Sequence, residues 1–380
     1  MRAPKTRHTP LYHGCQPVST PRIVQVTATA LSVPPRDRRI PWIWGAFNQV
    51  IVEVRTDDGL VGWGEAFGYG TPLAVTALVN HTLQPLLIGQ DASDIRGTIE
   101  SLFRATHLWG RFGVTTFAIS GVDIALWDLA GKRVNKPLFE LFGGAASRAI
   151  PSYCSLVRYR DLDLMTQHAA EAADAGSPMI KLHQIDVESV RRGREAVGAL
   201  PLTVDVNCEW TPLEAIQMAQ SMNEYDLYWL EEPVFPPEDY VGLARVARAS
   251  GVPIASGENA CTASQFLLMM ESRAVAFVQP SVIKVGGISE FLKVAALAEV
   301  YNVNLAPHSP YFGPGFLATL HLIAHLRQVS WIERLHLDLE ASLFKRPLSF
   351  DGTTYTVPDG PGLGLEVDPD VVRTYRVNGD

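Results

Sequence analysis

Two consecutive acids, Glu231 and Glu232, end a short apolar run in the segment YDLYWLEEPVFPPEDY. An apolar run of this length that stops before a proline is typical of a buried strand, so the acids are expected where the strand leaves its sheet. An isolated pair of acids is more often a solvated loop than a site. The rest of the chain has to decide between these interpretations.

Carboxylates recur at the same place in neighbouring segments. Asp205, Glu231 and Glu258 each end or follow a β-rich run, and successive ones are 26 and 27 residues apart. Three anions in one pocket of low dielectric constant repel one another unless a cation is present. An all-oxygen ligand set with room for water and substrate suits Mg²⁺ better than Zn²⁺, and the chain has no HExxH motif or CxxC pair. The pattern predicts a Mg²⁺ site.

Other ionisable residues share this periodic phase: Lys181, His183, His308 and Glu333. Each alone has an ordinary interpretation, as a lysine with a buried stem, a hydrogen-bonded turn histidine or an ion-paired glutamate. Chance does not place titratable groups at one strand end after another. We therefore expect these side chains at the same site as the three carboxylates.

The elements that must position these residues begin near Pro151. Amphipathic segments such as TPLEAIQMAQSM alternate with β-rich runs, which predicts an α/β fold with a parallel sheet. Eight units suit a closed TIM-type (β/α)7-8 barrel, whose strand ends meet on one face and carry the chemistry. VGGIS at 285–289 lacks the P-loop lysine and serine and is expected to be a tight turn. The runs are SYCSL, PMIKLH, LTVDVN, YWLEEP, VPIASGEN, VAFVQPS, VNLAPH and SWIERL.

Composition limits the classes of protein. With 380 residues, of which 47% are hydrophobic and 19% charged, the chain is long enough for two domains and a large core. A net charge of −8 disfavours nucleic acid and acidic membranes as partners. A small-molecule carboxylate as the partner and a homo-oligomer as the assembly are further expectations, which do not follow from composition.

Targeting signals and cysteine spacing favour the cytoplasm. Residues 1–21 have no apolar core of a secretory signal and are expected to be a flexible extension. No uninterrupted apolar run is long enough to cross a bilayer. The cysteines show no paired spacing typical of disulfides or zinc clusters: Cys15, Cys154, Cys208 and Cys261.

Several motifs together resemble a known family, the enolase superfamily, in its branch similar to mandelate racemase and muconate lactonizing enzyme. The resemblance covers residues 22 to 375 and extends to acid sugar dehydratases. The motifs are SGVDIALWDLAGK at 120–132, KLH at 181–183, DVN at 205–207, EEP at 231–233, GEN at 257–259, PSVIKVGG at 280–287, PHS at 307–309 and WIERL at 331–335.

The resemblance implies roles for the site residues. Asp205, Glu231 and Glu258 would ligate Mg²⁺, and Asn207 would contact the substrate or the metal shell. Lys181 and His183 would lie on one face of the substrate and His308 on the other. Glu333 would hydrogen-bond the substrate carboxylate.

The resemblance also implies the domains. Residues 22–145 would form an α+β capping domain, 146–345 the barrel with the active site, and 346–380 a C-terminal segment that returns to the cap. The loop 34–47 would cover the substrate with the hydrophobic side chains of Trp42, Trp44 and Phe47.

Two positions depart from the family pattern. His183 stands where relatives commonly have a second lysine, and Ser281, three residues before Lys284, stands where the branch has an aspartate paired with its catalytic histidine. We place Ser281 and Lys284 among the residues that contact substrate. These departures leave the reaction type open even though the metal site is expected.

The expected chemistry is removal of the proton next to a carboxylate, because Mg²⁺ and a cationic side chain can stabilise the resulting enolate. Dehydration of a sugar-derived hydroxy acid to a keto acid is our first expectation. A racemase or epimerase, a cycloisomerase and a non-catalytic ligand-binding protein are the alternatives.

Overall fold

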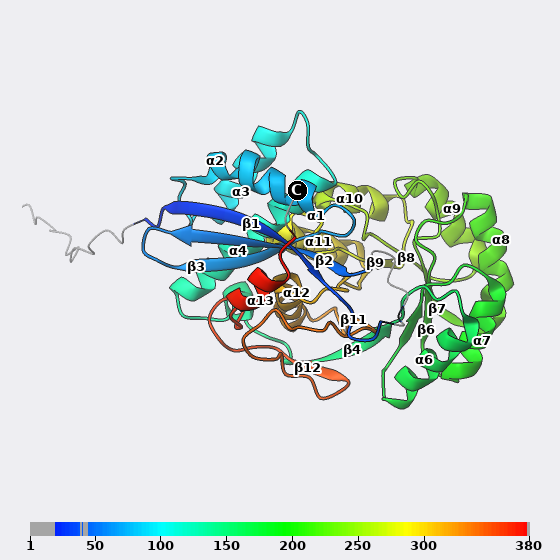
Figure 1. Cartoon of the computed structure of the whole chain (residues 1–380). Helices are drawn as coiled ribbons and strands as arrows, with labels where there is room; N and C mark the ends of the chain where they lie inside the picture. Colours follow the sequence, from blue (N-terminus) through cyan, green and yellow to red (C-terminus); the bar gives the residue numbers. More distant parts are fainter. Residues whose placement is uncertain (1–19, 39, 41–44, 378–380) are drawn as a thin grey trace, which may run out of the picture.

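The strands of the larger domain curl into a barrel (Figure 1). The computed structural model describes residues 20–38, 40 and 45–377. In this part of the chain the parallel strands follow the order β10-β9-β8-β7-β6-β5-β4-β11. They are β4 (Ala149–Ser155), β5 (Ile180–Leu182), β6 (Leu202–Asp205), β7 (Leu227–Glu231), β8 (Ile254–Ser256), β9 (Phe277–Val278), β10 (Asn304–Leu305) and β11 (Ile332–Leu335). These match the eight predicted runs, and the TIM-type fold is confirmed.

The barrel closes between β10 and β11 through side chains. No ladder pairs these two strands among the described residues. Instead, the hydroxyl of Ser309 donates to the carbonyl of Glu333 at 3.2 Å, and the amide of Glu333 donates back to that hydroxyl at 3.1 Å. This reciprocal pair fixes the strand that carries Glu333 against the chain that follows β10.

Helices cover the outside of the barrel (Figure 1). Their ends follow from local sequence: α8 begins with a capping box between Thr211 and Glu214 and has Pro212 in its first turn. Gly286 and Gly287 precede and begin α11 with φ of +115° and +84°, as expected for the tight turn at VGGIS. The helices are α6 (Leu162–Asp174), α7 (Val187–Val197), α8 (Pro212–Met222), η2 (Asn223–Tyr225), α9 (Tyr240–Ser250), α10 (Thr262–Glu271), α11 (Gly287–Tyr301) and α12 (Pro314–His325).

The N-terminal region forms a separate α+β layer against the barrel (Figure 1). Its antiparallel sheet has the order β1-β2-β3, with strands β1 (Ile23–Val33), β2 (Phe47–Thr56) and β3 (Val61–Ala66). One apolar side of this sheet packs against helices and forms its own core. The helices are α1 (Pro72–Leu78), η1 (Val79–Leu83), α2 (Gln84–Leu87), α3 (Ile95–Thr106), α4 (Val114–Arg133) and α5 (Leu138–Phe142).

Helix α4 is long and apolar enough to span a membrane by length and composition alone. However, 78% of its apolar window is buried inside the protein. A helix apolar on all sides is also what the centre of a large core requires.

The C-terminal segment contacts both layers. Strand β12 (Thr354–Thr356) pairs antiparallel with β4 of the barrel, so this part does not return to the cap as expected. After β12 the chain does reach the cap, where the amide of Leu363 donates to the carboxylate of Asp128 at 2.8 Å. Beyond α13 (Pro369–Thr374) it reaches the cap again, where the amide of Val377 donates to the carbonyl of Ala30 at 2.9 Å.

The two ends of the barrel interior differ in polarity. One end is filled by an apolar cluster of Tyr153, Met179, Trp229, Ala255 and Ala306. Charged side chains at the carboxyl ends of the strands occupy the other end, as described below. The interior is therefore a packed core under a polar mouth, as in other TIM barrels.

Candidate active site

Three carboxylates, two of them fully buried and that of Glu258 partly exposed, meet at the ends of successive strands. Asp205 ends β6, Glu231 ends β7 and Glu258 follows β8. One oxygen from each lies within 4.8 Å of the other two. The structure therefore brings together the predicted metal ligands.

Lys181 supplies a positive charge beneath these carboxylates. Its fully buried ammonium group lies 2.8 Å from Glu231, 3.4 Å from Asp205 and 2.7 Å from Glu333. Burial alone would lower the pKa of Lys181, but the surrounding carboxylates raise it well above its ordinary value. Lys181 therefore stays cationic and is not a base in this arrangement.

The carboxylates fit a magnesium ion. Mg²⁺ prefers carboxylate oxygens, and each residue of the triad offers one on the same side of the barrel mouth. Burial raises the pKa of Glu231 well above its ordinary value in spite of Lys181. One lysine therefore does not neutralise this cluster, and a divalent cation would supply the missing charge.

Two imidazoles flank the carboxylates. Nε2 of His183 lies 3.3 Å from Asp205, and Nε2 of His308 lies 2.5 Å from Glu258. The other ring nitrogen of each has a partner outside the site: Nδ1 of His183 contacts the carbonyl of Leu156. Both imidazoles thus direct Nε2 toward the same cluster from different strands.

Tyr311 holds the other nitrogen of His308. Its phenol oxygen lies 3.3 Å from Nδ1 of His308 and donates to the carbonyl of the same residue at 2.5 Å. The hydroxyl of Ser281 contacts this phenol. Ser281 therefore acts on His308 through Tyr311, and it is buried rather than exposed to substrate.

A cavity of about 520 Å³ opens above the carboxylates. Glu258, His183, His308, Glu333, Asn207 and Lys284 line it, which places six predicted residues on one wall. Phe67, Tyr69 and Phe117 close it from the cap. The cavity therefore has a charged floor and an aromatic roof, as small-molecule sites commonly do.

Two cations face this cavity. The ammonium group of Lys284 donates to the side chain of Asn259 at 3.2 Å and lies 4.6 Å from the ring centroid of Phe67. Arg158 also lines the cavity and donates to the side-chain oxygen of Asn207 at 3.2 Å. Both can bind an anionic substrate group.

Glu333 differs from the expected hydrogen-bond donor. It accepts from the backbone amide of Ser309 at 3.2 Å and pairs with Lys181. Burial alone would raise its pKa, but Lys181 and His308 lower it. In this arrangement Glu333 is an ionised acceptor, although it does line the cavity.

The predicted aromatic lid is not formed by Phe47. This residue begins β2, is fully buried and packs edge-on against Tyr69 and Phe312 at 4.8 Å. Its ring therefore supports the roof from behind and does not line the cavity. Trp42 and Trp44 lie outside the described residues.

Glu232 faces away from the carboxylate triad. It is buried and accepts hydrogen bonds from Ser256 at 2.6 Å, the amide of Gly257 at 2.8 Å and Asn259 at 3.0 Å. These bonds hold the turn that carries Glu258. The two acids of the pair thus have different tasks.

Sequence reasoning missed the residues that enter from loops and from the cap. Arg158 follows the first barrel strand, and Tyr311 lies two residues after the PHS motif at 307–309. A polar residue just after a strand end could have indicated Arg158. No comparable signal marks Phe67, Tyr69 or Phe117, because aromatic residues in a cap resemble ordinary core residues.

Family models match most of the chain. The model described as the Mandelate racemase / muconate lactonizing enzyme N-terminal domain matches residues 44–143. The model described as Enolase C-terminal domain-like matches residues 164–371, more than half of the chain. Together they cover the cap from residue 44, the barrel from residue 164 and most of the C-terminal segment.

Individual relatives agree with these models. An arabinonate dehydratase of Saccharolobus solfataricus is 36% identical over 86% of this chain and 90% of its own length. A 3,6-anhydro-alpha-L-galactonate cycloisomerase of Streptomyces coelicolor is 35% identical over 85% and 90%. The crystal structure of a racemase from Streptomyces coelicolor with bound magnesium has a TM-score of 0.83 and 32% identity, covering 93% of this chain and all of that one. The chain therefore belongs to the enolase superfamily, in the mandelate racemase/muconate lactonizing enzyme group, and is an enzyme of the lyase (dehydratase) or isomerase type.

Proposed function

We propose that this enzyme is Mg²⁺-dependent, removes the α-proton of a small hydroxy acid and eliminates its β-hydroxyl group to give a keto acid. The observation that carries the proposal is the pair of imidazoles at one cavity. Nε2 of His183 and Nε2 of His308 both face the carboxylate cluster, while Nδ1 of each is held elsewhere. A dehydration needs one group that takes a proton and another that gives one.

Binding of the substrate is assigned to the cations and the polar wall. The carboxylate of a sugar acid would meet Lys284 or Arg158, and its hydroxyls would meet Asn207 and Asn259. Mg²⁺ held by Asp205, Glu231 and Glu258 would supply positive charge where the enolate oxygens develop. Lys181 adds a fixed positive charge below the same place.

The two histidines then divide the proton transfers. Nε2 of His183 takes the α-proton, and the electron pair of the broken C–H bond moves into the enolate. The C=C bond forms as the C–O bond to the β-hydroxyl breaks. His308 delivers its proton to the departing oxygen, which leaves as water. Because the α-carbon of such a sugar acid also carries a hydroxyl group, the product is an enol, which becomes the 2-keto acid as the hydroxyl proton is lost and the β-carbon gains a proton.

We assign the base to His183 and not to Lys181. His183 lines the cavity, whereas Lys181 is fully buried among carboxylates and stays cationic. The arabinonate dehydratase supports dehydration as the reaction. The cycloisomerase of nearly equal identity supports a second candidate, in which the same α-proton moves without loss of hydroxyl.

A screen separates these reactions. A panel of sugar acids, lactones and other hydroxy acids is incubated with enzyme and Mg²⁺ in D₂O, and keto-acid formation and deuterium incorporation are measured together. We expect a keto acid from at least one sugar acid. Deuterium in recovered substrate and its stereoisomer without keto acid would show a racemase or epimerase. Ring opening or closure with no loss of water from the substrate would show a cycloisomerase, even where a ring oxygen is the leaving group and a keto acid forms. Binding without exchange would show a non-catalytic protein.

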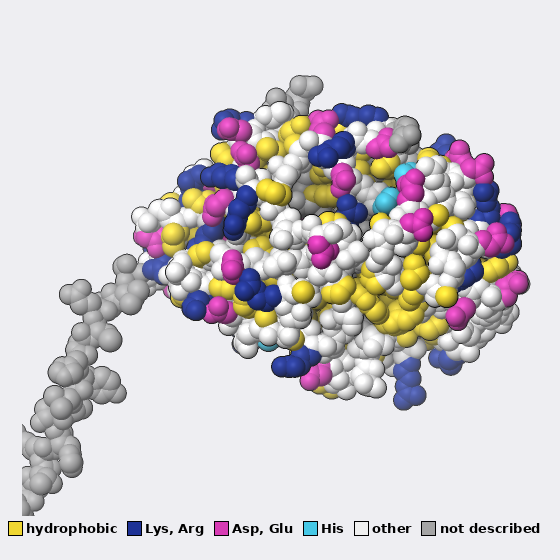
Figure 2. All heavy atoms as spheres, turned by 90° about the horizontal axis from the view of Figure 1, so that it is seen from below, with side chains coloured by type: hydrophobic (Ala, Val, Ile, Leu, Met, Phe, Trp, Pro, Cys, Tyr) yellow, Lys and Arg dark blue, Asp and Glu magenta, His cyan; other side chains and the backbone are white. Residues whose placement is uncertain are grey.

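We further propose a cytoplasmic homo-oligomer without nucleic-acid or membrane partners. Cys154, Cys208 and Cys261 are free thiols, as a reducing compartment requires. On the face in Figure 2, described acidic and basic side chains are interspersed. Leu108, Trp109 and Phe112 expose 85%, 51% and 54% of their surface between α3 and α4, which supports self-association. Sedimentation of the purified protein tests it, and a monomer would contradict it.

A further inference from the structure

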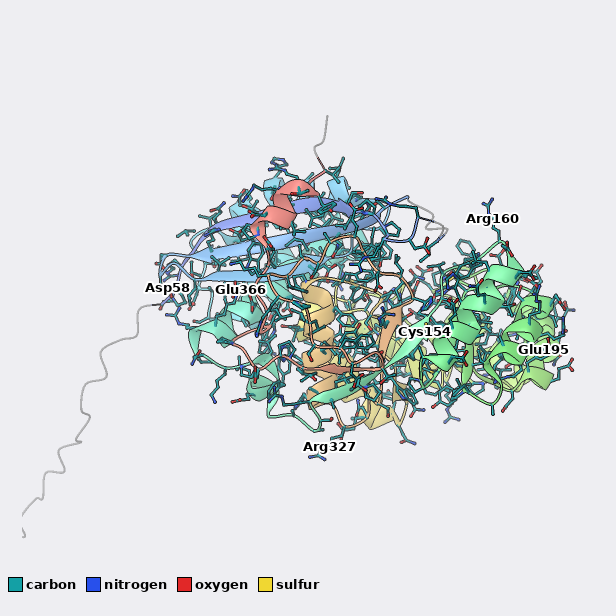
Figure 3. The ribbon with its side chains drawn as sticks, turned by 60° about the horizontal axis from the view of Figure 1, so that its bottom comes forward. Asp58, Cys154, Arg160, Glu195, Arg327 and Glu366 are labelled. Atoms are coloured by element: carbon teal, nitrogen blue, oxygen red, sulfur yellow. The ribbon has the colours of Figure 1, made fainter. Side chains whose placement is uncertain are left out.

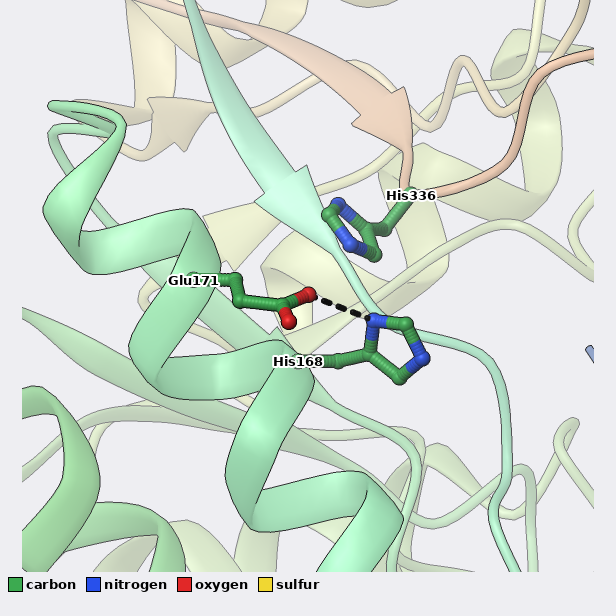
Figure 4. A group of neighbouring side chains, drawn as sticks. All are labelled: His168, Glu171 and His336. Carbon is green, nitrogen blue, oxygen red and sulfur yellow. Dashed lines mark ion pairs between the residues drawn. The ribbon is translucent and has the colours of Figure 1, made fainter.

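A second group of possible metal ligands lies outside the cavity, between helix α6 and the end of strand β11. His168 and Glu171 are three residues apart on α6, and His336 directly follows β11 (Figure 4). One ligand atom from each lies within 4.8 Å of the other two. None of the three lines the active-site cavity.

Each imidazole keeps one nitrogen for a further partner. Nδ1 of His336 lies 3.2 Å from the sulfur of Cys154, which leaves its Nε2 free of that contact. Nδ1 of His168 is buried and has no hydrogen-bond partner among the described residues, although a carboxylate oxygen of Glu171 lies 3.2 Å away. This nitrogen and the Glu171 carboxylate face each other without a well-formed hydrogen bond, and a metal ion between the two would satisfy both.

Packing already orients both rings. The ring of Tyr159 stacks on His168 at 5.3 Å and 21°, and the rings of His168 and His336 lie 5.3 Å apart at 68°. Ligand atoms of a tetrahedral zinc site are about 3.4 Å apart, so the group has to close by a small movement. The side chain of Glu171 is 51% exposed and can rotate to make that movement.

We propose that His168, Glu171 and His336 bind a divalent transition-metal ion such as Zn²⁺ at a site separate from the carboxylate triad. Two imidazoles and one carboxylate with an open fourth position suit Zn²⁺ or Co²⁺ and not Mg²⁺. Residues three apart on a helix lie on one face, so α6 presents two ligands together.

The surroundings support this site. Nδ1 of His336 contacts the sulfur of Cys154, and in the tautomer that donates Nδ1–H to this sulfur, Nε2 carries the free electron pair, as a ligand histidine commonly does. In Figure 3, Cys154 lies inside the protein, whereas Arg160 and Glu195 extend from the surface. Arg334 is a nearby positive charge that would repel a metal ion, but it pairs with Asp338 at 2.9 Å.

The ion would link two elements that otherwise pack against each other through their side chains. It would tie α6 to the segment that follows β11, three residues beyond Glu333 of the active site. A site of this kind stabilises the folded state because the unfolded chain does not hold the ligands together.

The test compares wild type with four single variants in excess Mg²⁺. Protein stripped with chelator is titrated with Co²⁺, and bound cobalt is measured by equilibrium dialysis, elemental analysis and visible absorbance. Wild type should bind one equivalent of Co²⁺ at this site. We expect His168→Gln and His336→Asn to bind that equivalent at least about tenfold more weakly. Glu171→Gln should weaken the same equivalent, and its exposed side chain makes misfolding less of a concern. The matched control is His81→Gln, at an exposed histidine.

Folding is checked by far-UV circular dichroism and by the Mg²⁺-dependent rise in melting temperature, both of which the variants should retain. Equal cobalt binding by wild type and all variants would overturn the proposal. The proposal would also be overturned if wild type bound only the cobalt equivalent that Glu231→Gln removes from the carboxylate triad. His168, Glu171 and His336 would then be a packing cluster and not a metal site.

Discussion

The phenol oxygen of Tyr311 lies 3.3 Å from Nδ1 of His308, and the same oxygen contacts the hydroxyl of Ser281. Burial raises the pKa of Tyr311 well above its ordinary value, so the phenol is neutral at physiological pH. Nδ1 of His308 can donate to this phenol, which leaves Nε2 facing Glu258. His308 is thus oriented by the neutral phenol of Tyr311, whereas the resemblance implied a carboxylate partner at position 281.

Replacing Tyr311 by Phe should slow dehydration without affecting the metal site. The change removes the contact that orients His308, and general acid catalysis is worth about 10²- to 10⁴-fold, so we expect kcat to fall about 10- to 100-fold. Mg²⁺ affinity and α-proton exchange should stay near wild type. The control is Tyr159→Phe, whose buried hydroxyl has no hydrogen-bond partner among the described residues.

The position of Tyr311 also changes the expected effect of Ser281→Asp. Because Ser281 contacts Tyr311, a carboxylate at position 281 would meet the phenol first. We expect Ser281→Asp alone to shift the pH profile of turnover less than the double variant Ser281→Asp/Tyr311→Phe. Equal shifts in both would show that Tyr311 does not separate position 281 from the histidine.

Chelation should abolish turnover and lower the melting temperature, and added Mg²⁺ should restore both. A ligand that binds only the folded state stabilises it by about 2.7 kcal/mol at a hundredfold excess over its Kd. Glu231→Gln should weaken Mg²⁺ binding measured by calorimetry at least about tenfold, because it removes one anionic ligand. Full activity in protein shown to be metal-free by elemental analysis would contradict the metal requirement.

The neighbouring acid gives the matched comparison. Glu232 holds the turn of Glu258 through Ser256, Gly257 and Asn259, so Glu232→Gln should lower the free energy of unfolding by about 1–3 kcal/mol. Its Mg²⁺ affinity should fall less than that of Glu231→Gln. The reverse order of affinities would show that Glu232 is the ligand.

The change in stability between pH 4.5 and 8 should depend on Glu65. This buried residue of β3 accepts from the amide of Gly315 at 2.8 Å, and burial raises its pKa from 4.5 to about 8. Below pH 4.5 the carboxyl is protonated in the folded and unfolded states alike. Between pH 4.5 and 8 the unfolded state loses this proton first, so stability falls as pH rises through this range.

Glu65→Gln keeps an acceptor for Gly315 and removes this dependence. In denaturant unfolding at pH 8 we expect the variant to be more stable than wild type by on the order of a few kcal/mol. The difference should become small near pH 4.5. A difference that does not change with pH would mean that Glu65 is ionised in the folded state throughout.

Sequence alone gave the barrel because its strands, helices and strand ends recur in one phase. Asp205, Glu231 and Glu258 could be placed together since parallel strands of a barrel end on one face. The same rule does not predict where a long side chain points when its residue lies beyond the end of a strand. Arg158 and Tyr311 turn into the site through loop geometry, which spacing does not encode.

The cap was harder for a different reason. Phe47 was expected on the lid because it is aromatic and follows a proline-containing loop, but it is the first residue of β2 and its side chain points into the core. Likewise, the whole segment 346–380 is expected at the cap, and although Leu363 and Val377 do bond to the cap, β12 pairs with β4 of the barrel. Which layer an edge strand joins depends on tertiary contacts that local pattern does not contain.

The division of proton transfers between His183 and His308 can be read in D₂O once a substrate is known. His183→Asn should abolish deuterium exchange at the α-carbon, because its Nε2 is the base that faces the cavity. His308→Asn should lose keto-acid formation by about 10²- to 10⁴-fold and retain some exchange, because it removes only the proton donor for the departing hydroxyl. Lys181→Met should also abolish exchange, but it leaves buried carboxylates unpaired, so its folding must be checked first. If His308→Asn instead eliminates exchange from one stereoisomer only, and wild type forms no keto acid, the two histidines serve opposite faces of a racemase and the dehydratase assignment is wrong.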